Sequence, residues 1–274
     1  MDSYFSKYGQ LLFEHKFNEA EEYRKNNVPN VLTKFYSLTS DEQLNEKKFE
    51  TLDKNEIWLS TASEMNDPFE FRGMYIDEEK LSAAGYPQEL IDAFKCFMDS
   101  FRKEYVLTSF TANSFESLPM WAYYANNSKG FCVEYKVIKP DTFFQVSYEP
   151  ERIAIASIMA NLYNDFSNLS KGKGALTDDT ELSGHLLTAQ MFMKHKSWAH
   201  EQEYRIIYPK DIDKNAGFSV STELLGLKVK RIICGINCSE KHKERLNAIS
   251  TKLGCGKMLK AVVSETKYIV LEET

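Results

Sequence analysis

Apolar positions near the start of the chain follow the spacing of a helix. Over residues 6–27 they recur every three or four residues, and Pro29 follows soon after the pattern ends. A break near His15 predicts two short helices in place of one long helix. We therefore expect a helical hairpin over residues 1–29, packed against a main domain over residues 30–274.

The rest of the chain mixes the two-residue period of strands with helical patterns. Strands are predicted at residues 31–37, 56–60, 105–110, 131–135, 143–148, 204–208, 230–235, 260–263 and 268–271. Helices are predicted at residues 41–53 with Ser40 as N-cap, 77–103 with a break at 85–87, 120–125, 151–169, 182–196 and 239–253. Because these elements do not alternate as regularly as in a doubly wound fold, we expect a single α+β domain. Its sheet should be mixed and largely antiparallel, with helices flanking it.

The stretch from Trp198 to Tyr208 carries the most distinctive pattern of charge. Successive side chains of a strand point to opposite faces, so Glu201, Glu203 and Arg205 are expected on one face. Two carboxylates about 7 Å apart raise each other's pKa, and an interposed arginine opposes that shift. In a cleft, such a row suits electrostatic or proton-transfer chemistry. On a solvated strand face it would contribute little.

Two further segments have both a structural and a functional interpretation. The sequence Asn66-Asp67-Pro68 follows a predicted strand, and Asx side chains that bond their own backbone favour a tight turn there. Alternatively, Asn66 or Asp67 points into a cleft. Trp121 and Tyr124 lie three residues apart on a predicted helix and share a face. They belong either to the core or to a wall on which a planar ring stacks.

Composition excludes several classes of protein. The 34 basic and 40 acidic residues give a net charge of −6, which argues against a general nucleic-acid-binding surface but leaves room for a local basic cleft. The sequence has neither a run long enough for a transmembrane helix nor a start typical of a signal peptide, so we expect a cytoplasmic protein that does not bind membranes. Five cysteines without a Cys-x-x-Cys pair predict free thiols and no metal site, with Cys132 and Cys234 buried.

Three motifs together resemble a large bacterial family known only as a domain of unknown function, whose members often lie among phage-defence genes. The motifs are Asn66-Asp67-Pro68-Phe69, the Met120–Ala125 segment followed by Lys129-Gly130-Phe131, and the Trp198–Arg205 stretch. The resemblance covers roughly residues 32–253. It departs from the family at Thr33-Lys34-Phe35-Tyr36, where Tyr-Lys-Tyr-Arg is common, so an expected arginine is missing.

The order of the motifs also resembles, more distantly, that of ADP-ribosyltransferases. Those enzymes carry an anchoring residue on an early strand, a central serine or aromatic motif, and a late Glu-x-Glu strand whose second glutamate is catalytic. The matching residues here are Lys34 or Tyr36, then Ser60 with Tyr124, then Glu201 and Glu203. The resemblance implies NAD as substrate, with Glu203 as the catalytic carboxylate and Glu201 as the group that activates the acceptor.

The same resemblance assigns the remaining parts of an NAD site. Trp121 or Tyr124 would hold the nicotinamide ring, and Arg205 or Lys34 would meet the pyrophosphate. Cleavage of the nicotinamide–ribose bond develops positive charge on the ribose, and a carboxylate stabilises that charge more in the transition state than in the ground state.

Three hypotheses of different classes follow. The first is an ADP-ribosyltransferase-like enzyme or NAD glycohydrolase, which in this setting would be a toxin or phage-defence effector with an unidentified acceptor. An effector of this kind is compatible with an antitoxin or a regulatory protein as its partner. The second is a hydrolase or nuclease that holds a divalent metal with Asp67, Glu201 and Glu203. The third is a non-enzymatic sensor or binding module in which the charges pair internally.

Overall fold

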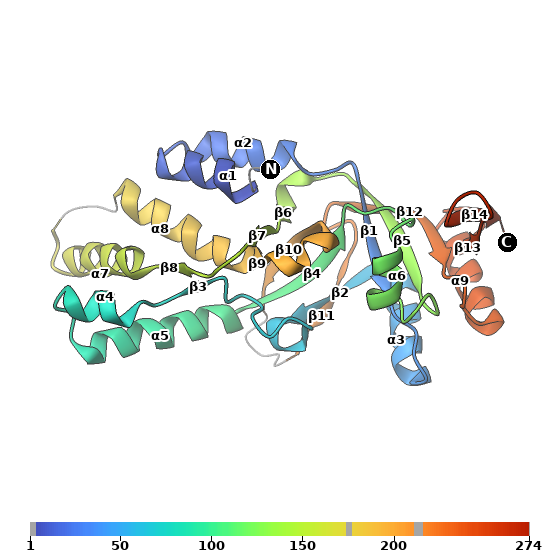
Figure 1. The fold of residues 1–274 in the computed structure, drawn as a ribbon, viewed down its shortest axis with the longest axis horizontal. Coiled ribbons are helices and arrows are strands. Elements are labelled where there is room, and N and C mark those ends of the chain that lie inside the picture. The colour runs from blue at the N-terminus through green and yellow to red at the C-terminus, as the bar shows by residue number, and fades with distance from the viewer. Residues whose placement is uncertain (1–3, 174–176, 211–215, 274) are drawn as a thin grey trace.

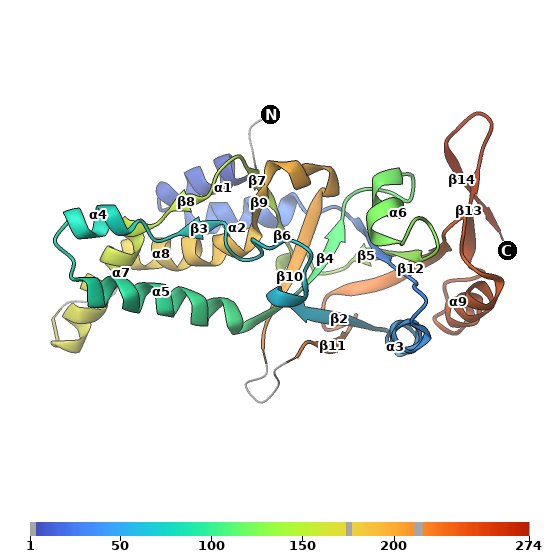
Figure 2. The same cartoon turned by 60° about the horizontal axis from the view of Figure 1, so that its bottom comes forward.

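The computed structural model describes residues 4–173, 177–210 and 216–273. It has an α+β fold, as predicted, with a mixed sheet flanked by helices. Figures 1 and 2 show an elongated arrangement in which most helices gather at one end of the long axis and most strands at the other. No helix of the described residues combines the length and apolar character needed to cross a membrane.

The helices agree closely with the sequence pattern. They are α1 (Tyr4–Phe13), α2 (Phe17–Asn26), α3 (Glu42–Asp53), α4 (Glu78–Ala83), α5 (Gln88–Lys103), α6 (Leu118–Tyr124), α7 (Ala156–Ser170), α8 (Asp178–Ala189) and α9 (Glu240–Lys252). The predicted N-terminal hairpin is present as α1 and α2, although residues 1–3 lie outside the described part of the chain. Its Leu12 and Ala20 pack against Leu186 of α8, so the hairpin covers the helical end of the molecule.

Within the described parts of the chain, ten strands form the large sheet and four form two small ones. They are β1 (Val31–Tyr36), β2 (Glu56–Thr61), β3 (Met74–Tyr75), β4 (Tyr105–Thr111), β5 (Phe131–Val137), β6 (Phe144–Gln145), β7 (Ser147–Glu149), β8 (Ile153–Ala154), β9 (Met193–His195), β10 (Glu203–Pro209), β11 (Phe218–Ser221), β12 (Leu227–Cys234), β13 (Leu259–Val263) and β14 (Ile269–Glu273). The main order is β11-β2-β4-β1-β5-β12-β13-β14, with β10 between β4 and β6. Its pairs are antiparallel except β12 with β13, while β3–β8 and β7–β9 are parallel pairs.

Alternation along β5 assigns its side chains to two layers of core. Phe131 and Val133 face a cluster that includes Phe49 of α3 and Leu246 of α9. Cys132 points to the other face and packs with Trp121 of α6. The sheet is therefore covered on one face by α3 and α9 and on the other by α6, as the two-residue period of a buried strand requires.

A notch interrupts one edge of β4. Strand β10 pairs with β4 along its full length, from Glu203–Thr111 to Pro209–Tyr105. The other edge of β4 is shared between two strands, because β2 reaches only Leu107 and β1 touches only Thr111. Between these contacts, no described strand pairs with that edge at residues 108–110. This edge of the backbone therefore has a gap in its strand pairing, where Lys34 donates to the carbonyl of Ser109.

Four local predictions are corrected by the structure. Asp41, and not Ser40, caps α3, because its carboxylate accepts from the backbone N–H groups of residues 43 and 44. The predicted strand 143–148 consists of two short strands, β6 and β7, which pair with different partners. Helix α7 begins at Ala156 because residues 153–154 pair with β3.

The fourth correction concerns the predicted helix 182–196. Helix α8 ends at Ala189, a single 3₁₀ turn covers Gln190–Phe192, and Met193–His195 forms β9 beside β7. Pairing with a neighbouring strand outweighs the local helical pattern here. The change matters because it turns the side chain of Lys194 inward.

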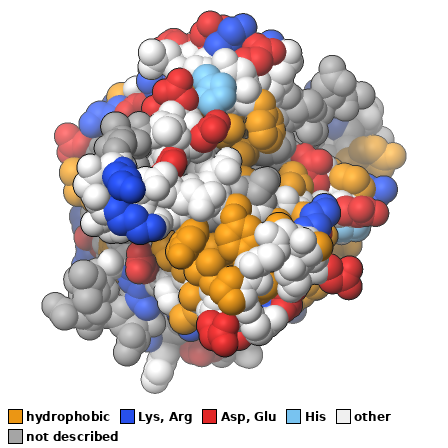
Figure 3. Space-filling view, turned by 90° about the vertical axis from the view of Figure 1, so that its left-hand side faces the viewer, with side chains coloured by type: hydrophobic (Ala, Val, Ile, Leu, Met, Phe, Trp, Pro, Cys, Tyr) orange, Lys and Arg blue, Asp and Glu red, His pale blue; other side chains and the backbone are white. Residues whose placement is uncertain are grey.

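The helical end of the molecule exposes several large apolar side chains. Figure 3 looks onto this end and shows hydrophobic side chains gathered on it. Phe97 of α5 is 46% exposed and Phe166 of α7 is 58% exposed, whereas their neighbours Phe94 and Met98 are buried. These helices thus bury one face against each other and leave part of a second apolar face in solvent.

Thiol reactivity provides a direct test of this core. All five cysteines are free; Cys132 and Cys234 are fully buried, whereas Cys96 on α5 is exposed. We expect iodoacetamide to modify Cys96 rapidly in the native protein, because reaction requires an accessible thiol, and to modify the two buried residues only after unfolding. Mass spectrometry of native and denatured samples measures the order. Rapid native labelling of both buried thiols would contradict the assigned core.

Candidate functional site

The notch beside β4 forms a pocket of about 150 Å³ on the face of the sheet that carries α6. Its walls come from β1, β2 and β4, from the turn after β2, from α6, and from charged residues of β9 and of the segment that follows it. The predicted site residues that line it are Lys34, Ser60, Asn66, Tyr124, Glu201 and Glu203. Segments that are far apart in the sequence therefore converge on one small polar pocket.

Lys194 connects the two glutamates at the base of the pocket. Its ammonium lies 2.8 Å from a carboxylate oxygen of Glu201 and 2.9 Å from one of Glu203. All three side chains are buried. The indole of Trp198 lies 5.2 Å from the same ammonium, a distance suited to a cation–π contact. Burial makes these pairs stronger than surface ion pairs, because little solvent screens them.

Arg205 extends this network below the pocket. Its Nε lies 2.7 Å from Glu203, its Nη1 lies 2.6 Å from Glu70, and Nη1 also donates to the carbonyl of Met191 at 2.5 Å. The guanidinium is completely buried. The hypothesis of a solvated strand face is therefore wrong, since all members of this row are removed from water.

The pKa values of the two pocket glutamates are shifted in opposite directions. Burial opposes ionisation of Glu203, but the nearby charges of Arg205 and Lys194 outweigh it and hold the pKa of Glu203 well below its usual value. Burial dominates at Glu201 and raises its pKa, even though Lys194 partly offsets this effect. Burial likewise raises the pKa of Glu70. The pocket thus pairs one firmly ionised carboxylate with one that binds a proton more readily.

A reversal of the backbone brings Glu201 and Glu203 together. Glu201 ends a 3₁₀ helix (Lys196–Glu201), and Gln202 adopts a left-handed conformation with φ of 45° before β10 begins at Glu203. The expectation of one continuous strand face is corrected accordingly. Thr111 stabilises the reversal by donating its hydroxyl to the Glu201 carbonyl at 2.5 Å.

The Asn66 turn and α6 form the rim of the pocket. The Tyr124 hydroxyl donates a short hydrogen bond to the Glu201 carboxylate, and Asn66 donates its amide to the Tyr124 oxygen at 3.3 Å. Asp67 instead accepts from the backbone N–H of Phe69 at 2.9 Å, which confirms the tight turn. The turn therefore lies beside β10 as part of the same site, although Asp67 does not line the pocket.

Lys34 enters the pocket from β1. Its ammonium donates at 3.0 Å to the carbonyl of Ser109, in the stretch of β4 that pairs with neither β1 nor β2. Burial lowers the pKa of Lys34 to about 8, partly opposed by the charge of Glu203. Tyr36 lies outside the pocket, where its hydroxyl meets that of Tyr135 at 3.1 Å.

Trp121 is part of the core and not of the pocket wall. It is 1% exposed, its indole N–H donates to the carbonyl of Phe115 at 2.6 Å, and Phe35 packs edge-on against it. The aromatic rings that line the pocket besides Tyr124 belong to Phe35, Trp58 and Phe110. Trp58 is 46% exposed, so its ring is available to a ligand at the mouth.

Two charged residues of the site, Lys194 and Glu70, were not identified from the sequence. Lys194 lay within a predicted helix, although the apolar run Met191-Phe192-Met193 before it is also consistent with a strand end. Glu70 follows the Asn66 turn directly, so its closeness to that motif was the available signal. Among the described residues, no group of three or more His, Cys, Asp or Glu side chains is arranged to hold a metal ion.

Comparison with known proteins supports part of the resemblance. Residues 120–206 match a family model described as a protein of unknown function, DUF2971. The matched region, about a third of the chain, includes α6, Lys194 and both pocket glutamates. No curated protein and no solved structure matches the chain significantly.

Removal of the buried Arg205 guanidinium should lower the free energy of unfolding. Replacing Arg205 with methionine leaves the Glu203 and Glu70 carboxylates buried beside an apolar side chain, and breaking one partner of such a network typically costs about 3–5 kcal/mol. Urea unfolding measures the change. The control is Arg245→Met, which removes a solvent-exposed pair with Glu46 and should change the free energy of unfolding little. Equal effects of the two substitutions would contradict the role assigned to the network.

Proposed function

We propose that the notch binds the nicotinamide ribose of NAD and that the protein is an ADP-ribosyltransferase-like enzyme or NAD glycohydrolase. The observation that carries this proposal is the pair of carboxylates, Glu201 and Glu203, whose pKa values are shifted in opposite directions within one pocket. Environments that separate the pKa values of two neighbouring acids are typical of sites that assign them different roles.

Glu203 suits electrostatic stabilisation in this reaction. The bond between the ribose C1′ and the nicotinamide nitrogen breaks, its electron pair leaves with nicotinamide, and positive charge remains on the ribose. An ionised carboxylate held rigidly by Arg205 and Lys194 needs no reorganisation to stabilise that charge. Glu203 is therefore assigned as the catalytic carboxylate.

Glu201 suits the second half of the reaction. A water molecule or an acceptor hydroxyl attacks C1′, forms the new C–O bond and must lose a proton. A carboxylate with a raised pKa accepts that proton more readily than one held firmly ionised. The hydrogen bond from Tyr124 fixes the orientation of the Glu201 carboxylate toward the pocket. Transfer and hydrolysis differ only in which oxygen attacks.

The remaining pocket residues match the other parts of the dinucleotide. The pocket of about 150 Å³ is sized for the reacting end of NAD, so the rest of the molecule would extend over the rim. Trp58 and Phe35 provide flat apolar surface for the nicotinamide ring, and the Lys34 ammonium provides positive charge for the pyrophosphate. Arg205 is assigned to positioning, since its guanidinium is fully engaged below the pocket.

The alternative functions receive less support from the geometry. A divalent metal would have to compete with Lys194 and Arg205 for the carboxylates of Glu201 and Glu203. Asp67, the third proposed ligand, is turned into its own backbone turn. The other alternative is a binding module that binds NAD without cleaving it. Release of nicotinamide distinguishes the enzyme from such a module.

Substitution of the carboxylates tests the proposal. We expect Glu203→Gln to lower nicotinamide release about a hundred- to thousand-fold, because it removes charge needed mainly in the transition state, while NAD binding changes much less. Glu201→Gln should impair transfer to an acceptor more than hydrolysis. The readouts are released nicotinamide and heat-unfolding shifts with NAD. A matched control is Glu134→Gln, another buried, ion-paired carboxylate that does not line the pocket.

The outcomes separate the hypotheses. If the wild type binds NAD but releases no nicotinamide, even with cell lysate as acceptor, the protein is a binding module. If NAD neither binds nor reacts, the proposed function is wrong. If Glu134→Gln reduces nicotinamide release as much as Glu203→Gln, the effect reports stability and the assignment of Glu203 fails.

The affinity for NAD should depend on the charge of Lys34. Its pKa of about 8 means that the free protein loses this positive charge as the pH rises through that value. We therefore expect NAD affinity to fall above about pH 8, because the pyrophosphate loses a charged partner. Calorimetric titration across this range measures the effect. Lys34→Arg should remove the pH dependence but keep the affinity, and Lys34→Met should lower the affinity at all pH values.

A further inference from the structure

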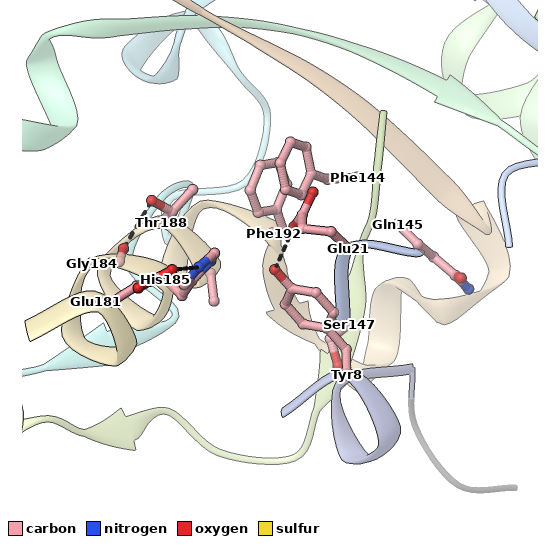
Figure 4. A pocket seen from close by; sticks show the side chains of 11 residues that line it. Tyr8, Glu21, Phe144, Gln145, Ser147, Glu181, Gly184, His185, Thr188 and Phe192 are labelled. Atoms are coloured by element: carbon pink, nitrogen blue, oxygen red, sulfur yellow. Dashed lines mark hydrogen bonds and ion pairs between the residues drawn. The ribbon is translucent and has the colours of Figure 1, made fainter. Parts of the chain in front are cut away.

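A second and larger cavity lies at the helical end, away from the notch. It has a volume of about 560 Å³, within the range typical of small-molecule sites. Figure 4 shows its walls, which come from the N-terminal hairpin, from α8 with the turn after it, and from β6 and β7. None of its lining residues belongs to the proposed NAD site.

A fixed pair of aromatic rings forms one wall of this cavity. Phe144 and Phe192 stack with centroids 4.0 Å apart and an angle of 10° between the rings. The guanidinium of Arg24 lies 4.1 Å from the Phe144 centroid, so it must cover the face of Phe144 opposite to Phe192. Arg24 also donates to the carbonyl of Phe143 at 2.6 Å. The ring wall is thus held in place by Arg24, and both of its rings line the cavity.

The lining carries two carboxylates and one imidazole. Glu21, Glu181 and His185 line the cavity, with His185 3.9 Å from the Glu181 carboxylate, and no lysine or arginine lines it among the described residues. Arg24 forms an ion pair with Glu21 at 2.5 Å, and its hydrogen bonds and charge overcome the effect of burial and lower the pKa of Glu21, so this carboxylate is ionised but already paired. The Tyr8 hydroxyl donates to it at 3.4 Å (Figure 4). A ligand with a phosphate or carboxylate would meet like charge here, whereas an amine would meet opposite charge.

Gly184 leaves the floor of the cavity open. It lies within α8, where glycine destabilises a helix relative to alanine. A Cβ atom built at this position would meet no heavy atom within 4 Å, so packing does not require glycine. The position is exposed and borders the cavity, and a side chain there would find open space around its Cβ atom.

We infer that this cavity binds a flat aromatic or heteroaromatic amine, neutral or cationic, that carries no phosphate or carboxylate. The ring would pack against the aromatic wall, and the amino group would face Glu181, with Glu21, already paired with Arg24, beside it. Gly184, another lining residue, leaves room at its own position on α8. This inference does not depend on the function proposed for the notch.

Three probes with one ring system test the chemistry. Tryptamine carries a cation, indole is neutral, and indole-3-acetate carries an anion. We expect calorimetric titration to show tryptamine binding at least about tenfold more tightly than indole-3-acetate, with indole between them. Glu181→Gln should reduce the difference in affinity between tryptamine and indole, because it removes one carboxylate from the lining of the cavity. The inference is overturned if tryptamine does not bind at concentrations up to about 10 mM or if indole-3-acetate binds equally well.

A variant of α8 then locates the binding. Gly184→Leu fills the floor of the cavity and should weaken tryptamine binding at least about tenfold, while removal of the helical glycine should keep the helix intact. Asn164→Leu, at an exposed position of α7 that does not line the cavity, is the matched control and should bind tryptamine as the wild type does. Unchanged tryptamine affinity in Gly184→Leu would place the ligand elsewhere, for example in the notch, and overturn the inference.

Discussion

The pairing of the buried Arg205 guanidinium is the constraint on which the site depends. An arginine does not lose its charge in a protein interior, so its burial requires anionic partners and hydrogen-bond acceptors. Glu203, Glu70 and the Met191 carbonyl satisfy it. Because Glu203 shares Lys194 with Glu201, this one cation ties together β10, the segment after α8, the strand β9 and the turn after β2.

Stability alone does not explain a buried ionic network in this region. Well-packed apolar side chains commonly give equal or greater stability, so the presence of five charged groups calls for another reason. The notch supplies one, because the sheet leaves an edge of β4 uncovered directly above the network. The opposite pKa shifts of Glu201 and Glu203 then arise in a pocket that both carboxylates line.

The two cavities differ in charge although they share parts of the backbone. Phe144 pairs with Arg205 across β6 and β10, and Phe192 lies two residues before Lys194. Lys194 nevertheless lines the notch while Phe192 lines the larger cavity. Phe192 ends a 3₁₀ turn and Lys194 belongs to β9, so the change of backbone conformation between them separates the two side chains.

Local pattern in the sequence determined the helical hairpin, most of the strands and the approximate borders of the helices, because periodic burial of apolar side chains is a local property. It also nominated Glu201, Glu203, Tyr124 and Asn66, which the structure brings into contact. Only the tertiary structure placed Trp121 in the core, recruited Lys194 and opened the notch. These features depend on pairing between strands distant in sequence and on which charges are buried together, and neither is encoded in the spacing of neighbouring residues.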